Sequence, residues 1–174
     1  FGAKVVLVSR EEGGFTGSIK MTEEYHQAHS NVFLPRQFEN QLNIQAHYFS
    51  TGPEVYMQMK RLGKHVDAFV AGVGTGGTVM GTGKFLKEMN SSTMVHPLEP
   101  SNSPTLSTGY KVGKHRIQGI SDEFIPSIVD FRQLDSILHV DDGDSIIMAQ
   151  QLAKKLGLGV GISSGANFLG AVQA

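Results

Sequence analysis

Residues 66–78, with the sequence VDAFVAGVGTGGT, determine the fold class of this chain. The first part, VDAFVA, is rich in β-branched and aromatic side chains, which is typical of a buried strand. The second part, GVGTGGT, contains four glycines and leads directly into residues 78–89, which have the pattern of a helix. A buried strand that passes through a glycine-rich turn into a helix is the repeating unit of α/β folds with a parallel sheet.

The same alternation of strand and helix continues on both sides of this segment. We expect further strands at residues 4–8, 31–34, 93–99 and 137–140, and further helices at residues 17–26, 53–62, 141–156 and from about 165 onward. Residues 37–43 read as a polar loop. Pro97 has no N–H to donate to a sheet, so we expect the strand at 93–99 to be an edge strand or to carry a bulge. The sequence therefore predicts an α/β fold with a mainly parallel, twisted sheet and helices on both faces.

The composition excludes several classes of protein. The chain has 174 residues, of which 40% are hydrophobic, and a net charge of −1, so it can form a real core and has no basic surface for nucleic acid or anionic membranes. It has no cysteine, which excludes disulfides and thiol chemistry and is compatible with the cytoplasmic location that we expect. No apolar run approaches the roughly 18 residues of a membrane span, and no targeting signal is visible at the start.

Neither the histidines nor the acidic residues predict a metal site. His26 and His29 lie three residues apart, but no third ligand is near them in the sequence. Asp141, Asp142 and Asp144 lack the spacing of a calcium loop and read as the start of a helix.

The glycine-rich turn at residues 72–78 is a candidate anion site. Successive backbone N–H groups in such a turn point toward one centre, and the start of the following helix adds partial positive charge, so phosphate is the natural ligand. Thr75 and Thr78 add hydroxyl donors. A tight turn without a ligand is the simpler alternative.

A dinucleotide site is a second alternative for the same turn. Gly72, Gly74 and Gly77 satisfy the pattern GxGxxG, and Glu99 stands at the end of the next strand, where an acid that binds a ribose is expected. A P-loop is excluded, because Gly83-Lys84 is followed by phenylalanine instead of serine or threonine.

Residues 161–165, with the sequence GISSG, form a second glycine-bounded turn ahead of a helix. The pattern GxSxG is that of a hydrolase nucleophile, here Ser163, but that fold needs a histidine downstream and none follows. Two other interpretations remain: a serine hydroxyl that bonds a ring nitrogen of a ligand, and a capped helix start.

Four stretches in order resemble one family. They are residues 37–43 (QFENQLN) with Ala46-His47 and residues 51–54 (TGPE), residues 71–78 (AGVGTGGT), residues 115–120 (HRIQGI) with residues 124–126 (FIP), and residues 160–166 (VGISSGA). Together they resemble the cysteine synthase (O-acetylserine sulfhydrylase) family, which uses pyridoxal 5'-phosphate (PLP) and has the tryptophan-synthase-β fold type, known as PLP fold type II. Cystathionine β-synthase is the nearest relative, and the form IQGI at residues 117–120 favours cysteine synthase.

The resemblance implies a role for each matching position. The residues that would hold the PLP phosphate are Gly74, Thr75, Gly76, Gly77 and Thr78. Ser163 would bond the pyridine nitrogen, and because a hydroxyl leaves that nitrogen largely unprotonated, the ring suits β-elimination and replacement. Gln37 would help to hold the substrate carboxylate, and Gly119 would lie near the amino-acid substrate as the site closes.

The chain also departs from the family pattern. No stretch matches the first third of the family, which carries the Schiff-base lysine, so residues 1–174 resemble the central and C-terminal portion of the catalytic domain. Lys20 stands in a superficial Ser-x-Lys pattern, but its neighbours match a surface helix of the family, and we expect Lys20 to be solvated. Residues 121–123 (SDE) replace a glycine-rich stretch and add negative charge near the mouth of the site.

The function implied by the resemblance is PLP-dependent β-replacement that forms L-cysteine from O-acetylserine and sulfide. The alternatives are a cystathionine β-synthase-like enzyme and a non-catalytic module that binds phosphate or a partner. The resemblance further implies a homodimer and binding of the C-terminal tail of serine acetyltransferase in the active site.

Overall fold

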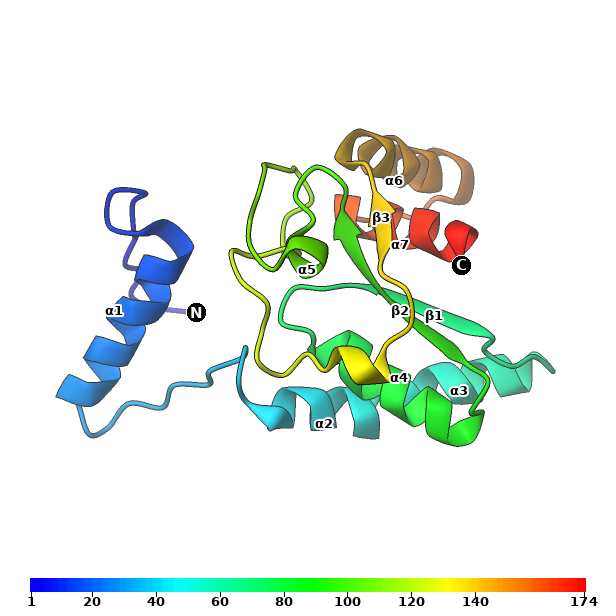
Figure 1. The fold of residues 1–174 in the computed structure, drawn as a ribbon, viewed down its shortest axis with the longest axis horizontal. Coiled ribbons are helices and arrows are strands. Elements are labelled where there is room, and N and C mark those ends of the chain that lie inside the picture. Colours follow the sequence, from blue (N-terminus) through cyan, green and yellow to red (C-terminus); the bar gives the residue numbers. More distant parts are fainter. The chain divides into compact units, whose positions relative to one another are not determined.

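A computed structural model describes residues 1–174, which form two compact units, Phe1–Arg36 and Gln37–Ala174. The elements, labelled in Figure 1, are α1 (Gly14–Ala28), α2 (Gln41–Phe49), α3 (Thr51–Arg61), β1 (Ala68–Gly72), α4 (Gly77–Met89), β2 (Met94–Pro100), α5 (Thr105–Thr108), the 3-10 helix η1 (Phe131–Gln133), β3 (Leu138–Val140), α6 (Asp142–Leu156) and α7 (Ile162–Gln173). None of these helices combines the length and the apolar character that crossing a membrane requires.

The unit Phe1–Arg36 contains one helix and no strand. Helix α1 covers the predicted helix at residues 17–26 and extends it at both ends. The strands predicted at residues 4–8 and 31–34 are wrong, since neither segment forms a strand. Leu7 is 86% exposed and Phe33 is 83% exposed. A run of β-forming side chains becomes a strand only when a neighbouring strand accepts its hydrogen bonds.

The unit Gln37–Ala174 is built on a three-stranded parallel sheet with the order β1-β2-β3. Strand β1 pairs with β2 from Ala68–Met94 to Gly72–Leu98. Strand β2 pairs with β3 over only three residues, beginning with Leu98 opposite Leu138. The parallel sheet predicted from the alternation of strands and helices is confirmed.

The prediction that Pro97 places its strand at an edge is wrong, because β2 is the central strand. The ladder with β3 begins only after Pro97, at Leu98. Before that point Asp135 replaces a strand partner, since its carboxylate accepts from Val95 N at 2.7 Å and its N–H donates to Val95 O at 2.8 Å. The proline therefore lies where a central strand needs no donor toward β3.

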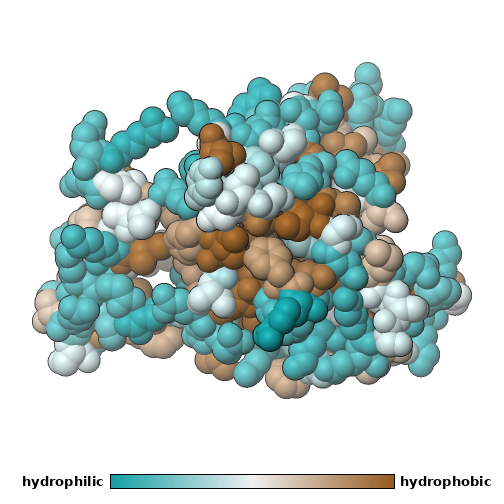
Figure 2. Space-filling model, viewed as in Figure 1, coloured by the Kyte–Doolittle hydropathy of each residue, from teal (hydrophilic) through white to brown (hydrophobic).

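Helices cover both faces of the sheet, as the sequence predicted (Figure 1). One core lies on the α4 side and consists of Ala71, Val73, Val79, Met80, Val95 and Leu106. The other lies on the α7 side and consists of Leu98, Ile117, Ile120, Val140 and Ala166. Figure 2 shows that hydrophobic residues remain visible at the surface among hydrophilic ones. The sheet therefore separates two hydrophobic cores, one on each of its faces.

Helix α2 replaces part of the polar loop predicted at residues 37–43. Asn40 is its N-cap, and the Asn40 side chain accepts a hydrogen bond from Leu42 N at 3.0 Å. The helix packs closely on α4, because a Cβ at Gly81 would lie 2.2 Å from Ile44 O. The close approach places the polar face of α2 beside the start of α4.

Helix α6 begins and ends as predicted. The Asp141 side chain accepts from Gly143 N at 2.7 Å and from Asp144 N at 3.2 Å. Gly157 ends the helix with φ 69°, in the left-handed region that glycine adopts easily. These acidic residues therefore form a helix start, in agreement with the sequence prediction.

Candidate functional site

The turn between β1 and α4 presents unpaired backbone donors. Strand β1 ends at Gly72 and α4 begins at Gly77, with Gly76 as N-cap at φ 91°. The N–H groups of Gly74, Thr75, Gly76 and Thr78 make no hydrogen bond within the chain. Four free donors at the start of a helix form a cradle for an anion, which the helix dipole further stabilises.

Three glycine positions of this turn leave no room for a side chain, because atoms of other segments lie too close. A Cβ at Gly74 would lie 2.3 Å from Gly119 O, and one at Gly76 would lie 2.4 Å from a Val129 methyl group. A Cβ at Gly77 would lie 2.0 Å from Asn43 Oδ1. Side chains here would fill the cradle or displace its walls, so the turn fits a phosphate group bound through the backbone.

Helix α2 holds both threonine hydroxyls of the turn. Asn43 Nδ2 donates to Thr75 Oγ1 at 2.9 Å, and Thr75 Oγ1 also accepts from Gly77 N at 3.3 Å. The Thr78 hydroxyl lies 3.2 Å from His47 Nε2. The opposite ring nitrogen of His47 lies 2.9 Å from Thr51 Oγ1. The hydroxyls are therefore oriented by a neighbouring helix and not left to rotate freely.

Gln37 and Gly119, the two residues predicted to bind substrate, both lie next to the cradle. The Gln37 carbonyl accepts from Asn43 Nδ2 at 2.8 Å, while the Gln37 residue is exposed. Gly119 has φ 88°, and its carbonyl faces Gly74 closely enough to exclude a Cβ there. The structure thus brings these two positions to the turn at residues 74–78.

The loop that carries Gly119 is fixed from both sides. Ile117 is fully buried and Ile120 is 7% exposed. Arg116 donates to the Asp142 carboxylate at the start of α6 through its backbone N at 2.9 Å. Its side-chain Nε and Nη2 donate to the same carboxylate, each at 3.1 Å. The hydrogen bond from Arg116 lowers the pKa of the Asp142 carboxyl below its usual value.

Ser163 lies in the first turn of α7, at the edge of the sheet where the strands end. Asn167, one turn later, accepts from Gly72 N at 2.8 Å. A Cβ at Gly170 would meet Val70, so α7 runs back along β1 from its C-terminal end. The Ser163 hydroxyl makes no hydrogen bond within the chain. The start of α7 is capped by no side chain, with Gly161 as N-cap, so the interpretation of Ser163 as a helix cap is wrong.

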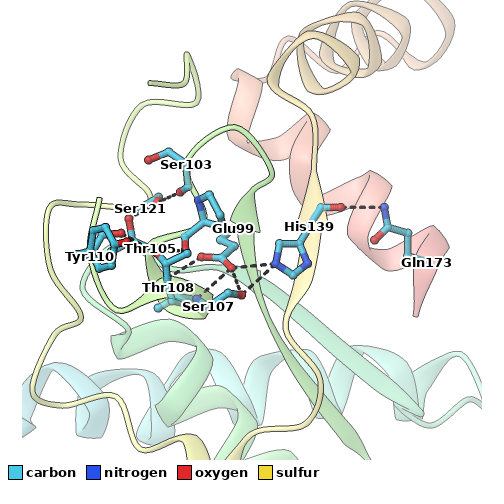
Figure 3. A network of polar contacts seen from close by, with 11 residues as sticks. Glu99, Ser103, Thr105, Ser107, Thr108, Tyr110, Ser121, His139 and Gln173 are labelled. Atoms are coloured by element: carbon cyan, nitrogen blue, oxygen red, sulfur yellow. Dashed lines mark hydrogen bonds and ion pairs between the residues drawn. The ribbon is translucent and has the colours of Figure 1, made fainter. Parts of the chain in front are cut away.

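Glu99 occupies a position that rules out the dinucleotide alternative. Its side chain is fully buried and accepts from Leu106 N at 2.6 Å and Ser107 N at 3.2 Å, at the start of α5. His139 Nε2 lies 3.0 Å from the same carboxylate. Figure 3 shows these groups converging on Glu99. A carboxylate whose acceptors are all used inside the chain is not available to a ribose.

Two further charged residues were singled out in the sequence. Lys20 pairs with Glu24 at 3.8 Å and its side chain is 79% exposed, which confirms that it is solvated. Asp122 is half-buried, and this burial raises the pKa of its carboxyl above the usual value. Asp122 follows Ser121, whose N–H donates to Val73 O at 2.8 Å, so this acidic residue lies close to the end of β1.

Sequence reasoning missed three side chains that organise the site: Asn43, His47 and Asn167. Asn43 and His47 stand inside the motif quoted for residues 37–47, and Asn167 directly follows the turn at residues 161–165. The signal that could have found them is the helical spacing of Asn43 and His47, four residues apart. That signal was hidden because residues 37–43 were read as a loop.

The comparisons with known proteins bear on the fold and on the class of cofactor. Residues 1–174 match the protein family described as "Pyridoxal-phosphate dependent enzyme". This chain therefore belongs to the family of PLP-dependent enzymes, and the cofactor class and fold type predicted from the motifs are confirmed.

Three relatives show which kinds of PLP-dependent enzyme this chain resembles. A probable cysteine synthase of Bacillus subtilis (strain 168) is 42% identical over 173 residues, which cover 99% of this chain and 55% of the relative. The crystal structure of a hydrogen sulfide-producing enzyme from Fusobacterium nucleatum matches with a TM-score of 0.95 and 61% identity, covering 99% of this chain and 51% of that one. An O-acetylserine-dependent cystathionine β-synthase from Helicobacter pylori matches with a TM-score of 0.85 and 37% identity, covering 99% and 54%. The chain spans about half the length of these relatives.

Proposed function

We propose that this chain supplies the cofactor-holding part of a PLP-dependent β-replacement enzyme that forms L-cysteine from O-acetylserine and sulfide. The observation that carries the proposal is the cradle of four unpaired N–H groups at Gly74, Thr75, Gly76 and Thr78. A 42% identical relative is a probable cysteine synthase.

The turn at residues 74–78 would hold the cofactor phosphate. Its free N–H groups and the Thr75 and Thr78 hydroxyls supply hydrogen-bond donors, and the start of α4 supplies partial positive charge. When bound, PLP supplies an electron sink that acidifies the α-hydrogen of an amino acid and allows its β-substituent to leave. The contribution of these residues is anchoring and orientation, without transfer of a proton.

Ser163 and the two substrate residues complete the proposed arrangement. The free Ser163 hydroxyl is assigned to the pyridine nitrogen of PLP, which it leaves largely unprotonated. The Gln37 side chain is assigned to the substrate carboxylate, and Gly119, beside Gly74, to the wall that faces the amino acid. The proximity of these positions to the phosphate cradle supports both assignments.

We also propose that no lysine within residues 1–174 forms the Schiff base with PLP. The exposure of Lys20 and its ion pair with Glu24 support this assignment. The experiment is a PLP titration of the full chain followed by borohydride reduction and peptide mapping. We expect saturable PLP binding without labelling of a specific lysine. Stoichiometric labelling of one lysine would contradict the proposal, whereas the absence of any PLP binding would overturn the phosphate site.

A second candidate activity is the release of sulfide from L-cysteine. The 61% identical relative is a hydrogen sulfide-producing enzyme, and this chain has the acidic residues Asp122 and Glu123 where the resemblance implies a glycine-rich stretch. The two activities are distinguished by supplying the protein either with O-acetylserine and sulfide or with L-cysteine alone, and by measuring cysteine and sulfide. The 37% identical relative is an O-acetylserine-dependent cystathionine β-synthase. The protein should therefore also be supplied with O-acetylserine and homocysteine, to test for a reaction of that kind.

The proposed assembly and location follow the same resemblance. We expect a homodimer, which light scattering after gel filtration would test, and a cytoplasmic location. We also expect a peptide with the sequence of a serine acetyltransferase C-terminal tail to compete with O-acetylserine. A non-catalytic module remains the alternative, and it would bind PLP and show no turnover with any of these substrates.

A further inference from the structure

The hydrogen bonds around Thr75 determine the direction of its hydroxyl proton. Thr75 Oγ1 accepts from Asn43 Nδ2 at 2.9 Å and from Gly77 N at 3.3 Å. A hydroxyl has two acceptor lone pairs and one proton. Both lone pairs of Thr75 are therefore in use, and its proton, which has no acceptor within the chain, is left to donate to a ligand.

The orientation of the Asn43 amide is itself fixed by a backbone group. The same Nδ2 donates to the Gln37 carbonyl at 2.8 Å, and a carbonyl only accepts hydrogen bonds. The atom of Asn43 that faces Gln37 and Thr75 must therefore be the nitrogen. Its oxygen lies against Gly77, where a Cβ would come within 2.0 Å of it.

From this geometry we propose that Asn43 is a positioning residue that turns the Thr75 hydroxyl proton into the phosphate cradle. By bonding Gln37 and Thr75 with one amide, Asn43 also joins the segment that carries the proposed carboxylate-binding residue to the phosphate turn. The inference rests on the proposed phosphate site. It adds to that site a residue that touches neither the phosphate nor the substrate.

The substitution Asn43→Asp tests the proposal with the smallest change in shape. A carboxylate has no N–H, so it repels the Gln37 carbonyl and accepts the Thr75 proton that would otherwise reach the phosphate. Gln45→Glu is the matched control, because Gln45 is exposed on the same helix and undergoes the same amide-to-acid change. The readout is the ratio of the affinities for PLP and for pyridoxal, which lacks the phosphate.

We expect Asn43→Asp to lower this ratio by about 10- to 100-fold, the effect of one lost hydrogen bond to a charged group. Pyridoxal binding and the Gln45→Glu variant should stay within about 2-fold of the wild type. An Asn43→Asp variant with an unchanged ratio would overturn the proposal while leaving the phosphate site intact. A wild-type chain that does not prefer PLP to pyridoxal would overturn both.

A double-mutant cycle keeps the test valid if Asn43→Asp also lowers the stability. Thr75→Val removes the hydroxyl through which Asn43 is proposed to act. In the Thr75→Val background, Asn43→Asp should lower the ratio by less than about 3-fold, because residues that act through one group are not additive. Full additivity of the two substitutions would show that Asn43 acts by another route and would contradict the proposal.

Discussion

Two glycine-bounded turns lie at the same edge of the sheet, and they use their glycines differently. In the turn before α4, close neighbours would block a Cβ at Gly74, Gly76 and Gly77. At the start of α7, a Cβ at Gly161 would meet nothing within 4 Å, whereas one at Gly165, in the first turn of the helix, would lie 2.1 Å from Ser145 O of α6. The first turn needs glycine to expose its backbone to a ligand, and the second needs it to pack two helices.

This difference separates the proposed contacts with the two ends of PLP. The turn before α4 offers backbone donors, which suit a phosphate of any orientation. The first turn of α7 offers one free side-chain hydroxyl, that of Ser163, which suits a single directed bond to a ring atom. The pair of ligands PLP and pyridoxal therefore tests the two turns independently.

The largest expected effect comes from Gly74→Ala. Its Cβ would lie 2.3 Å from the Gly119 carbonyl, which is backbone and cannot rotate away. To relieve this contact the turn must shift, which displaces N–H groups that are proposed to hold the phosphate. The loss of one hydrogen bond to a charged group corresponds to a roughly 10- to 150-fold lower PLP affinity, which absorbance titration would measure. Gly161→Ala is the matched control and should stay close to the wild type. Equal losses in the two variants would remove the distinction between the turns.

Ser163→Ala should have a smaller effect with a different pattern. The loss of one neutral hydrogen bond corresponds to about 0.5–1.5 kcal/mol, or a roughly 2- to 12-fold weaker affinity. Because the bond is assigned to the ring, PLP and pyridoxal should lose affinity equally, whereas Gly74→Ala should affect PLP more. Ser164→Ala controls for a change in the helix start. A loss confined to PLP would place Ser163 at the phosphate instead.

Asp142→Asn should weaken the anchoring of the loop that carries Gly119. The Arg116 guanidinium lowers the pKa of Asp142 from its ordinary value of 3.8, so the charged carboxylate contributes stability above that pH and loses it as the pH falls below. At pH 7 we expect a melting temperature lower by about 2–4 °C. The difference from the wild type should shrink as the pH falls below 3.8 and through the lowered pKa of Asp142 in the folded chain. A difference that does not shrink over this range would contradict the role of the ion pair.

The smallest expected effect is that of Lys20→Met. The Lys20 side chain is 79% exposed and makes only the ion pair with Glu24, 3.8 Å away. Exposed pairs of this kind contribute little, so stability should change by less than about 0.5 kcal/mol. PLP affinity should not change. A large loss of affinity would reopen the Ser-x-Lys interpretation that the neighbouring residues argue against.

The sequence predicted the elements that need only local information. The buried strand ending at Gly72, the helix that follows it, and α6 with its Asp141 cap and Gly157 stop are all found. Their signals are apolar periodicity, a capping side chain and a glycine at the end, which are properties of one segment. The motifs likewise identified the glycine-rich turn at residues 72–78, whose proposed role in binding phosphate remains a prediction.

The errors concern features that depend on distant residues. Residues 4–8 have strand-forming side chains but no strand beside them, and Pro97 is accepted in a central strand because the ladder with β3 begins only at Leu98. Helix α2 was missed because its polar side chains face other elements: Asn43 and His47 bond the threonines of the phosphate turn. A residue whose role is to bond a segment 30 or so positions away gives no periodic signal of its own.

The burial of Glu99 has a mechanical consequence for the loop that carries Gly119. Glu99 ties the start of this loop to the end of β2 through Ser107, and Arg116 ties its end to Asp142 on α6. Gly119 lies between this attachment and the hydrogen bond from Ser121 N to Val73 O at 2.8 Å, so the loop is held on both sides of it. A displacement of Gly119 therefore has to break one of these hydrogen bonds or carry the attached ends of β1 and α6 with it.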